Sequence, residues 1–368
     1  MRTAEADIAT ERGPAVSPGP LVETLASTPV LGAALGILTW PLVSILPASG
    51  PDPSWLAGLY MAHGEGLQFG KEIVFTYGPL GFLQSPVLYS EILWALAFLF
   101  QAALHLGVAI SLLYVGRRSL PLPLAALACY CLLVIGSLEA SAVLIAFIWC
   151  FLALEKSRPR RASFALIAAG GALAAIELLV KANYGVTVLV LVALTVLGLE
   201  GRRRNLPVFA VALLGTFGAC WLLAGQDLSG LPAFLSHSAQ MIAGYSDAMG
   251  TNIIAVPWER WAAIGAIALT VGATALASRG GPLPRRLATL GLVVVFSFTA
   301  FKQGFVRQGL GNTPEFFVLI ACAGLTVASR LPRTALRGAA LALTVPLIGL
   351  ALAVLPTPSL EESLKPQA

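Results

Sequence analysis

Long apolar stretches, repeated along the whole chain and separated by short polar segments, constrain this sequence more than any other feature. A helix needs about 20 mostly apolar residues to cross the roughly 30 Å of hydrocarbon in a bilayer. Only 11% of the 368 residues are charged, whereas a soluble domain has about 25%, so this chain could not cover a water-facing surface. The sequence therefore predicts an all-α, polytopic transmembrane helix bundle. The ~10 alternating residues of a membrane-barrel strand are far fewer than these stretches contain.

We predict about eleven spans within a transmembrane domain at 28–355. The segment before them, 1–27, mixes charged residues with Pro and Gly and lacks the apolar core of a signal peptide, so we predict a disordered cytoplasmic tail. Residues 356–368 are predicted to form a short outer tail. The predicted spans are 28–47, 89–115, 119–137, 139–154, 162–180, 183–199, 206–224, 259–277, 287–301, 315–329 and 338–355.

The basic residues predict the orientation, because cytoplasmic loops of membrane proteins are enriched in Lys and Arg. With the N-terminus in the cytoplasm, 17 of the 23 basic residues fall in the inside segments, and eleven spans then place the C-terminus outside. We therefore predict a multi-pass protein of the cell (inner) membrane. The net charge of +5 comes from these short clusters, so nucleic acid is not an expected partner. The inside clusters are Arg2 and Arg12; Arg117 and Arg118; Lys156, Arg158, Arg160 and Arg161; Arg202, Arg203 and Arg204; Arg279, Arg285 and Arg286; and Arg330, Arg333 and Arg337.

Two long loops, at 48–88 and 225–258, both fall on the predicted outer side, together with most of the acidic residues. Long non-repetitive loops often carry binding or catalytic residues. The apolar residues from Trp55 to Tyr60 and from Leu231 to Ile242 have helical spacing. Each long loop is therefore predicted to contain a helix that lies on the membrane surface.

The first long loop gathers polar residues directly before an aromatic turn. An interfacial loop with solvated charges explains this pattern, and so does a binding or catalytic loop centred on a carboxylate. In the second loop, His237 lies on the polar face of the predicted surface helix, and the sequence leaves open whether it faces a cavity. The polar residues of the first loop are His63, Glu65, Lys71 and Glu72, and the turn runs from Phe75 to Pro79.

Charged residues also lie at the outer ends of two predicted spans. Glu177 and Lys181 are four residues apart and would share a helix face. They would either neutralise each other within the bundle or line a pathway, because a charge inside a span costs about 2.5–3.5 kcal/mol. Lys302 and Arg307 bracket Gly304, and they would either bind a phosphate or extend to the membrane surface.

The segment GLQFGKEIVFTYGPLGFL, from Gly66 to Leu83, resembles the first outer loop of the GT-C superfamily. These membrane glycosyltransferases use polyprenyl-phosphate-linked sugars, and the likeness is to the protein mannosyltransferase-like branch or to uncharacterised bacterial membrane proteins related to it. The resemblance implies a GT-C-like hexosyltransferase. An outer-loop carboxylate would act as base on the acceptor while cations stabilise the departing phosphate.

Carried onto this sequence, the resemblance implies Glu72 as the base, with Glu65 as the second candidate. The residues expected to bind the substrate or the lipid phosphate are Lys71, Tyr77, Lys181, Lys302 and Arg307, and the supporting residues are His63, Glu177 and His237. The expected partners are a polyprenyl-phosphate-linked sugar and membrane lipids. We expect no cofactor and no metal ligand set, since the chain has three histidines and no zinc motif, and a divalent cation is left open.

Two other classes of protein compete with the transferase. A transporter or lipid flippase would use Glu177 and Lys181 as a gated pair and would need a cavity at the midplane. A non-catalytic membrane subunit of cell-envelope glycan assembly would keep the architecture without the reaction. An outward cavity that joins both long loops would favour the transferase.

The orientation can be tested with reporter tags, because each tag reports the side on which its loop lies. Tags at 156–161, 202–205 and 280–286 are expected to report the cytoplasm, and tags at 48–52 and 225–230 the outside. A cytoplasmic signal from the loop at 225–258 would contradict the topology.

Overall fold

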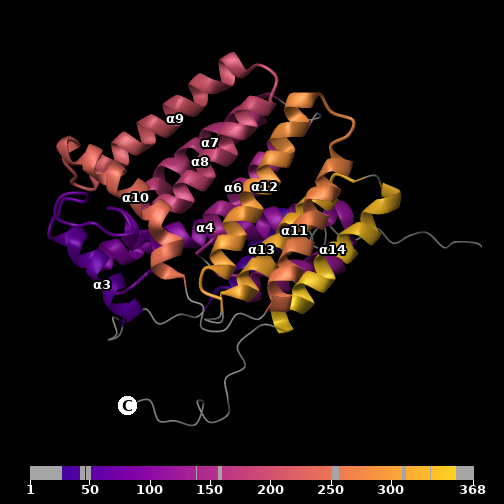
Figure 1. Ribbon diagram of the computed structural model, residues 1–368, viewed down its shortest axis with the longest axis horizontal. Coiled ribbons are helices and arrows are strands. Elements are labelled where there is room, and N and C mark those ends of the chain that lie inside the picture. The colour runs from indigo at the N-terminus through magenta and orange to yellow at the C-terminus, as the bar shows by residue number, and fades with distance from the viewer. Residues whose placement is uncertain are drawn as a thin grey trace, which may run out of the picture.

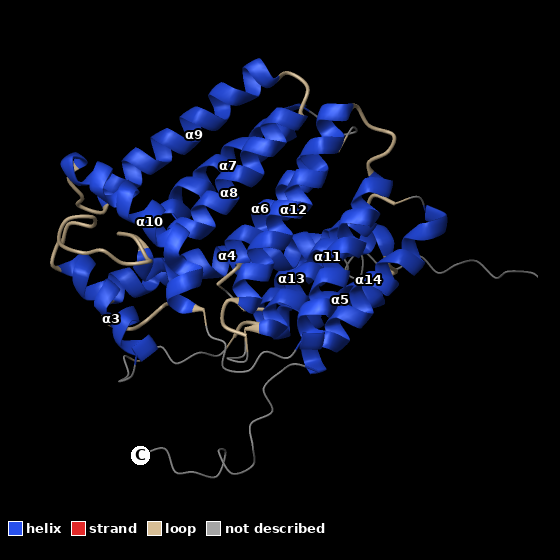
Figure 2. Cartoon of the chain, viewed as in Figure 1, coloured by secondary structure: helices blue, strands red, loops and turns tan. Residues whose placement is uncertain are grey.

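The computed structural model of the chain describes residues 27–41, 46, 51–137, 139–155, 160–250, 257–308, 312–331 and 333–353. Within these ranges the chain is helical, with two isolated β-bridges and no strand (Figures 1 and 2). The predicted all-α class is therefore confirmed. The predicted tails at 1–27, apart from Ser27, and at 356–368 lie outside the described residues.

Each of the eleven predicted spans corresponds to a helix. A long apolar run in a membrane forms a helix because its backbone N–H and C=O groups must bond to one another within the segment. In Figure 1, α7, α8 and α9 run side by side, while α11 to α14 form another part of the bundle. The eleven helices are α2 (Thr28–Leu38), α4 (Glu91–Ser119), α5 (Leu122–Ile135), α6 (Ser141–Ala153), α7 (Arg160–Val180), α8 (Ala182–Gly198), α9 (Arg202–Leu223), α11 (Pro257–Ala277), α12 (Leu283–Phe305), α13 (Thr313–Ala328) and α14 (Arg333–Ala353).

Five of these helices are long and apolar enough to cross a membrane, namely α4, α7, α9, α11 and α12. In the other six, the described apolar stretch has 10–17 residues. The structure thus supports a membrane protein with several spans, and the count of eleven stays a prediction. Nearly every residue of α13 is buried, because α4, α5, α6, α11, α12 and α14 all contact it.

Both long loops contain the helix that their apolar spacing predicts. These are α3 (Pro51–Gly64) and α10 (Leu231–Met249), accompanied by the 3-10 turns η1 (Gly81–Gln84) and η2 (Leu228–Gly230). The indole ring of Trp55 in α3 stacks on the ring of Tyr77, with the two centroids 4.6 Å apart. This aromatic contact fixes α3 to the later part of its own loop.

Two glutamines join the first long loop to the second. The side-chain amide of Gln68 donates to the carbonyl of Gly225 at 3.0 Å, and its oxygen accepts from the backbone N–H of Asp227 at 2.8 Å. Gln226 makes the reciprocal bonds to the first loop. Its oxygen accepts from the N–H of Phe69 at 2.8 Å, and its amide donates to the carbonyl of Leu67 at 3.1 Å. Each glutamine therefore satisfies backbone groups of the other loop, so the two loops form one unit.

Residues at the predicted inner ends of the spans contact one another away from the two long loops. The guanidinium of Arg117 donates to Thr28, Arg118 forms an ion pair with Glu155, and Arg285 lies 3.5 Å from Glu200. These contacts agree with the predicted alternation of the loops, while the side that faces the cytoplasm stays a prediction.

The Gly78–Pro79–Leu80 segment docks where α7 ends and α8 begins. The N–H groups of Gly78 and Leu80 donate to the carbonyls of Val180 and Leu179 at 3.0 and 2.9 Å. A Cβ atom on Gly78 would lie 2.5 Å from the carbonyl oxygen of Leu179. Only glycine permits this close approach of two backbones.

We predict that Gly78→Ala destabilises the protein by about 1–3 kcal/mol, because the new methyl group forces the two backbones apart. The free energy of unfolding, measured by denaturation in mixed micelles, checks this. The matched control is Gly58→Ala in α3, where a Cβ would meet nothing within 4 Å. Equal stability of the two variants would contradict the docking argument.

Candidate functional site

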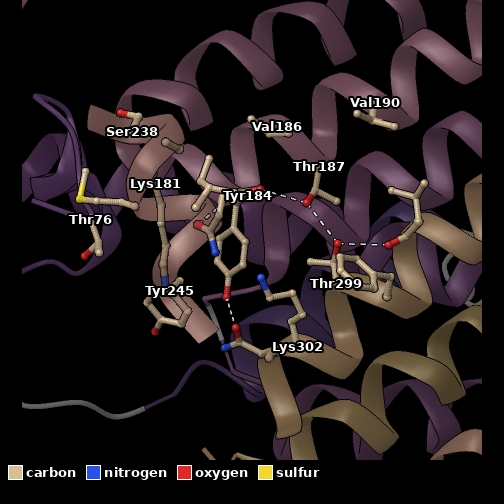
Figure 3. A pocket seen from close by; sticks show the side chains of 17 residues that line it. Thr76, Lys181, Tyr184, Val186, Thr187, Val190, Ser238, Tyr245, Thr299 and Lys302 are labelled. Atoms are coloured by element: carbon tan, nitrogen blue, oxygen red, sulfur yellow. Dashed lines mark hydrogen bonds between the residues drawn. The ribbon is translucent and has the colours of Figure 1, made fainter. Parts of the chain in front are cut away.

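A pocket of about 300 Å³ lies between α8, α10 and α12, and Thr76 of the first long loop closes one side (Figure 3). Within the described residues it thus brings together both long loops and two helices of the bundle. Most of its wall is apolar. The apolar lining includes Val186 and Val190 of α8, Met241 and Ile242 of α10, and Val295 and Phe298 of α12.

Two lysines, Lys181 and Lys302, also line this pocket, together with Tyr184, Tyr245 and Gln303. The ammonium of Lys302 lies 5.9 Å from the ring centre of Phe298, and among the described residues it forms no ion pair. Its charge is therefore available to an anionic ligand. A pocket with apolar walls and cationic groups suits an amphiphile that carries an anionic head group.

Lys181 lies between α7 and α8 and is only 7% exposed. It forms an ion pair with Glu139, a residue in the short connection between α5 and α6. Its ammonium also lies 5.0 and 4.6 Å from the ring centres of Tyr77 and Tyr184. One carboxylate and two aromatic faces thus compensate the loss of water around this charge.

Glu139 receives hydrogen bonds on both carboxylate oxygens. Oε1 accepts from Lys181 and lies 3.4 Å from the hydroxyl of Tyr77, while Oε2 accepts from the amide of Gln303 at 3.3 Å. Burial alone would raise the pKa of Glu139, but the charge of Lys181 and these hydrogen bonds hold that pKa below its ordinary value. The carboxyl is therefore ionised at neutral pH. Burial raises the pKa of Tyr77, so its hydroxyl stays protonated and can donate.

The side-chain amide of Gln303 also donates to a second carboxyl, that of Glu315 in α13. Gln303 donates to Glu315 at 3.1 Å, and the hydroxyl of Ser137 donates to the other oxygen of Glu315 at 2.5 Å. The hydroxyl of Tyr184 donates to the side-chain oxygen of Gln303 at 2.6 Å, which fixes the direction of the amide. Gln303 therefore connects both acidic residues to the pocket.

The sequence-predicted residues fall into two groups. Lys181 and Lys302 line the same pocket, and Tyr77 contacts Lys181. Arg307 is absent from the lining, and its guanidinium instead contacts the sulfur of Met249 at 3.5 Å. His237 is also absent from the lining, whereas its neighbour Ser238 belongs to it.

The polar residues of the first loop lie apart from the pocket lining. Glu72 is exposed, and its carboxylate accepts from the N–H of Gln68 at 2.7 Å, which closes its own turn. Lys71 donates to Ser229 at 2.8 Å, and Glu65 is exposed. His63 packs 4.8 Å from the ring of Phe82, and burial lowers its pKa, so it is neutral at pH 7.

Glu177 and Lys181, for which the sequence left mutual neutralisation and a pathway open, form no ion pair with each other in the described structure. Glu177 is 3% exposed within α7, and the ion pair of Lys181 goes to Glu139 instead. The reason is the backbone of Lys181, whose φ of −146° and ψ of 101° are extended. The N–H of Lys181 still donates to the carbonyl of Glu177 at 2.8 Å, but the extended φ and ψ change the direction of its side chain, so the i to i+4 geometry that brings two side chains together does not apply.

Sequence reasoning did not assign Glu139, Glu315, Tyr184 or Gln303 to a site. Their signal in the sequence is weak, since Tyr184 and Gln303 carry no charge and all four lie near the ends of apolar runs. Among the described residues, no group of three or more His, Cys, Asp and Glu side chains could hold a metal ion. No family model, curated protein or solved structure matches the chain.

We predict that Lys181→Met lowers the free energy of unfolding by about 1–3 kcal/mol, because it leaves Glu139 without its counter-ion in a partly buried position. Lys302→Met is the matched control, since that lysine is part-exposed and has no ion pair within the described residues. It should change stability by less than about 0.5 kcal/mol.

The double variant Lys181→Met/Glu139→Gln should recover part of the loss, because the uncompensated charge is then removed as well. Denaturation in mixed micelles measures all three variants. A double variant that is less stable than Lys181→Met alone would contradict the ion-pair explanation.

Proposed function

We propose that this chain is a GT-C-like integral membrane glycosyltransferase. It transfers a sugar, as a hexosyltransferase does, from a polyprenyl-phosphate donor to an acceptor at the non-cytoplasmic face. The observation that carries the proposal is the pocket bounded by both long loops, which combines apolar walls with Lys181 and Lys302.

The donor and the pocket have matching chemistry. A prenyl chain is apolar and would lie along Val186, Val190 and Phe298, while its phosphate would meet the ammonium of Lys302. A cation at this place stabilises the charge that develops on the phosphate when the sugar leaves. Its effect is large because apolar walls exclude water and lower the local dielectric constant.

The competing classes have less support. A transporter that uses Glu177 and Lys181 as a gated pair would need the two side chains to meet, and Lys181 contacts Glu139 instead. A non-catalytic assembly subunit would bind the same lipid in the same pocket. Transfer of the sugar, and not binding alone, therefore separates the transferase from such a subunit.

We predict that the purified protein binds polyprenyl phosphate more tightly than the uncharged polyprenol of the same length. Lys302→Gln should weaken binding of the phosphate about tenfold or more, because a charge-assisted contact contributes about 1.5–3 kcal/mol. Arg307→Gln is the matched control, since it removes a positive charge from the same segment without altering the pocket lining.

Titration calorimetry in detergent micelles measures these affinities. Equal affinity for the alcohol and the phosphate would contradict the assignment of the pocket. The reaction itself is assayed with a polyprenyl-phosphate sugar and a panel of acceptors. Binding without transfer to any acceptor would favour the non-catalytic subunit.

A further inference from the structure

We propose that Glu139 is the catalytic base of the transfer and that Lys181 positions it, a role that rests on the proposed function. The base takes the proton of the acceptor hydroxyl while the sugar leaves its lipid phosphate. Sequence resemblance alone pointed to Glu72 for this role, and the geometry around the pocket points to Glu139.

Glu139 lies next to the pocket without lining it, and it is partly exposed. Its side chain is 32% exposed, so the residue is not enclosed within the bundle. Its two oxygens contact Lys181 and Gln303, and both of these residues line the pocket. Glu177, at 3% exposure, is enclosed.

The carboxylate is also held in one orientation. Lys181, Tyr77 and Gln303 come from three separate segments, and each contacts one of its oxygens. Tyr184 fixes Gln303 in turn through a 2.6 Å hydrogen bond. A base must lie within about 3 Å of the proton it takes, so a fixed carboxylate is suited to the task. By contrast, the carboxylate of Glu72 closes a turn and contacts no residue of the pocket lining in the described structure.

The reaction balances with these groups alone. The bond between the sugar C1 and the phosphate oxygen breaks, and its electron pair stays on the phosphate. The acceptor oxygen forms the new bond to C1, and its proton passes to Glu139. The products are the glycosylated acceptor, a lipid phosphate with one more negative charge, and a protonated carboxyl that later releases its proton to water.

Lys181 couples the gain of negative charge on the phosphate to the protonation of Glu139, because it contacts Glu139 and also lines the pocket. As the phosphate gains negative charge, the ammonium is attracted towards the pocket and away from the carboxylate. The carboxylate becomes more basic when its counter-ion leaves, at the moment when it must accept a proton. The same ion pair that keeps Glu139 ionised at rest therefore assists proton transfer.

The test measures transfer by the full chain from a polyprenyl-phosphate sugar to an acceptor that the wild type uses. Glu139→Gln keeps the shape and removes the basicity, so the rate should fall about a hundredfold or more. Affinity for polyprenyl phosphate should be retained or rise, since Lys302 is unchanged and Lys181 has lost its counter-ion. Glu91→Gln, an exposed carboxylate in the first turn of α4, should retain the wild-type rate. The loss of transfer rate in Glu72→Gln should be at least tenfold smaller than the loss in Glu139→Gln.

The outcomes separate the two proposals. A wild type that binds the lipid and transfers nothing overturns both. An active wild type with Glu139→Gln within tenfold of its rate, or with Glu72→Gln as the slower variant, overturns the role of Glu139 alone. If Glu139→Gln does not fold, Glu139→Asp decides, because it keeps the charge and moves the carboxylate. A stable, lipid-binding Asp variant that is slowed tenfold or more supports the role, and one at the wild-type rate overturns it.

Discussion

Lys181 has a positive charge where α7 ends and α8 begins, in mainly apolar surroundings, and much of the surrounding structure compensates that charge. Glu139 reaches it from the connection between α5 and α6, Tyr77 from the first long loop and Tyr184 from α8. Gln303 links the same carboxylate to α12. Because an uncompensated charge in apolar surroundings costs several kcal/mol, these segments cannot separate without a penalty. The requirement to neutralise one lysine thus fixes the polar side of the pocket.

The helices could be predicted from the sequence, whereas the pairing of their polar residues could not. Apolar runs determine where a helix forms, since every backbone group in a membrane must be satisfied within its own segment. The partner of Lys181 depends instead on where α7 ends, because the backbone conformation of Lys181 sets the direction of its side chain. The spacing of apolar residues does not predict that conformation. Lys302, which lines the pocket, was among the predicted residues because it is charged at the end of an apolar run, while Tyr184 and Gln303 carry no charge that would distinguish them.

The first long loop has a segment that docks against the bundle and, a few residues earlier, an exposed turn. The Gly78–Pro79–Leu80 segment docks against the backbone of Leu179 and Val180, and it brings Tyr77 next to Lys181. Six residues before Gly78, Glu72 belongs to an exposed turn that is stabilised by its own carboxylate. The structure connects this loop to the pocket through Thr76, which lines it, and through Tyr77, which contacts Lys181.

The paired glutamines Gln68 and Gln226 set an order for the assembly of the protein. The amide of Gln68 and the carbonyl of Gly225 that it contacts are 157 positions apart. A chain made from its N-terminus exposes the first loop while α9 has not yet been synthesised. Until residues 225–227 emerge, the backbone groups of Leu67 and Phe69 depend on water or on another protein for hydrogen bonds. The pocket is completed later still, when α10 and α12 arrive, so a chain that stops soon after residue 227 has joined its two loops but lacks two walls of the pocket.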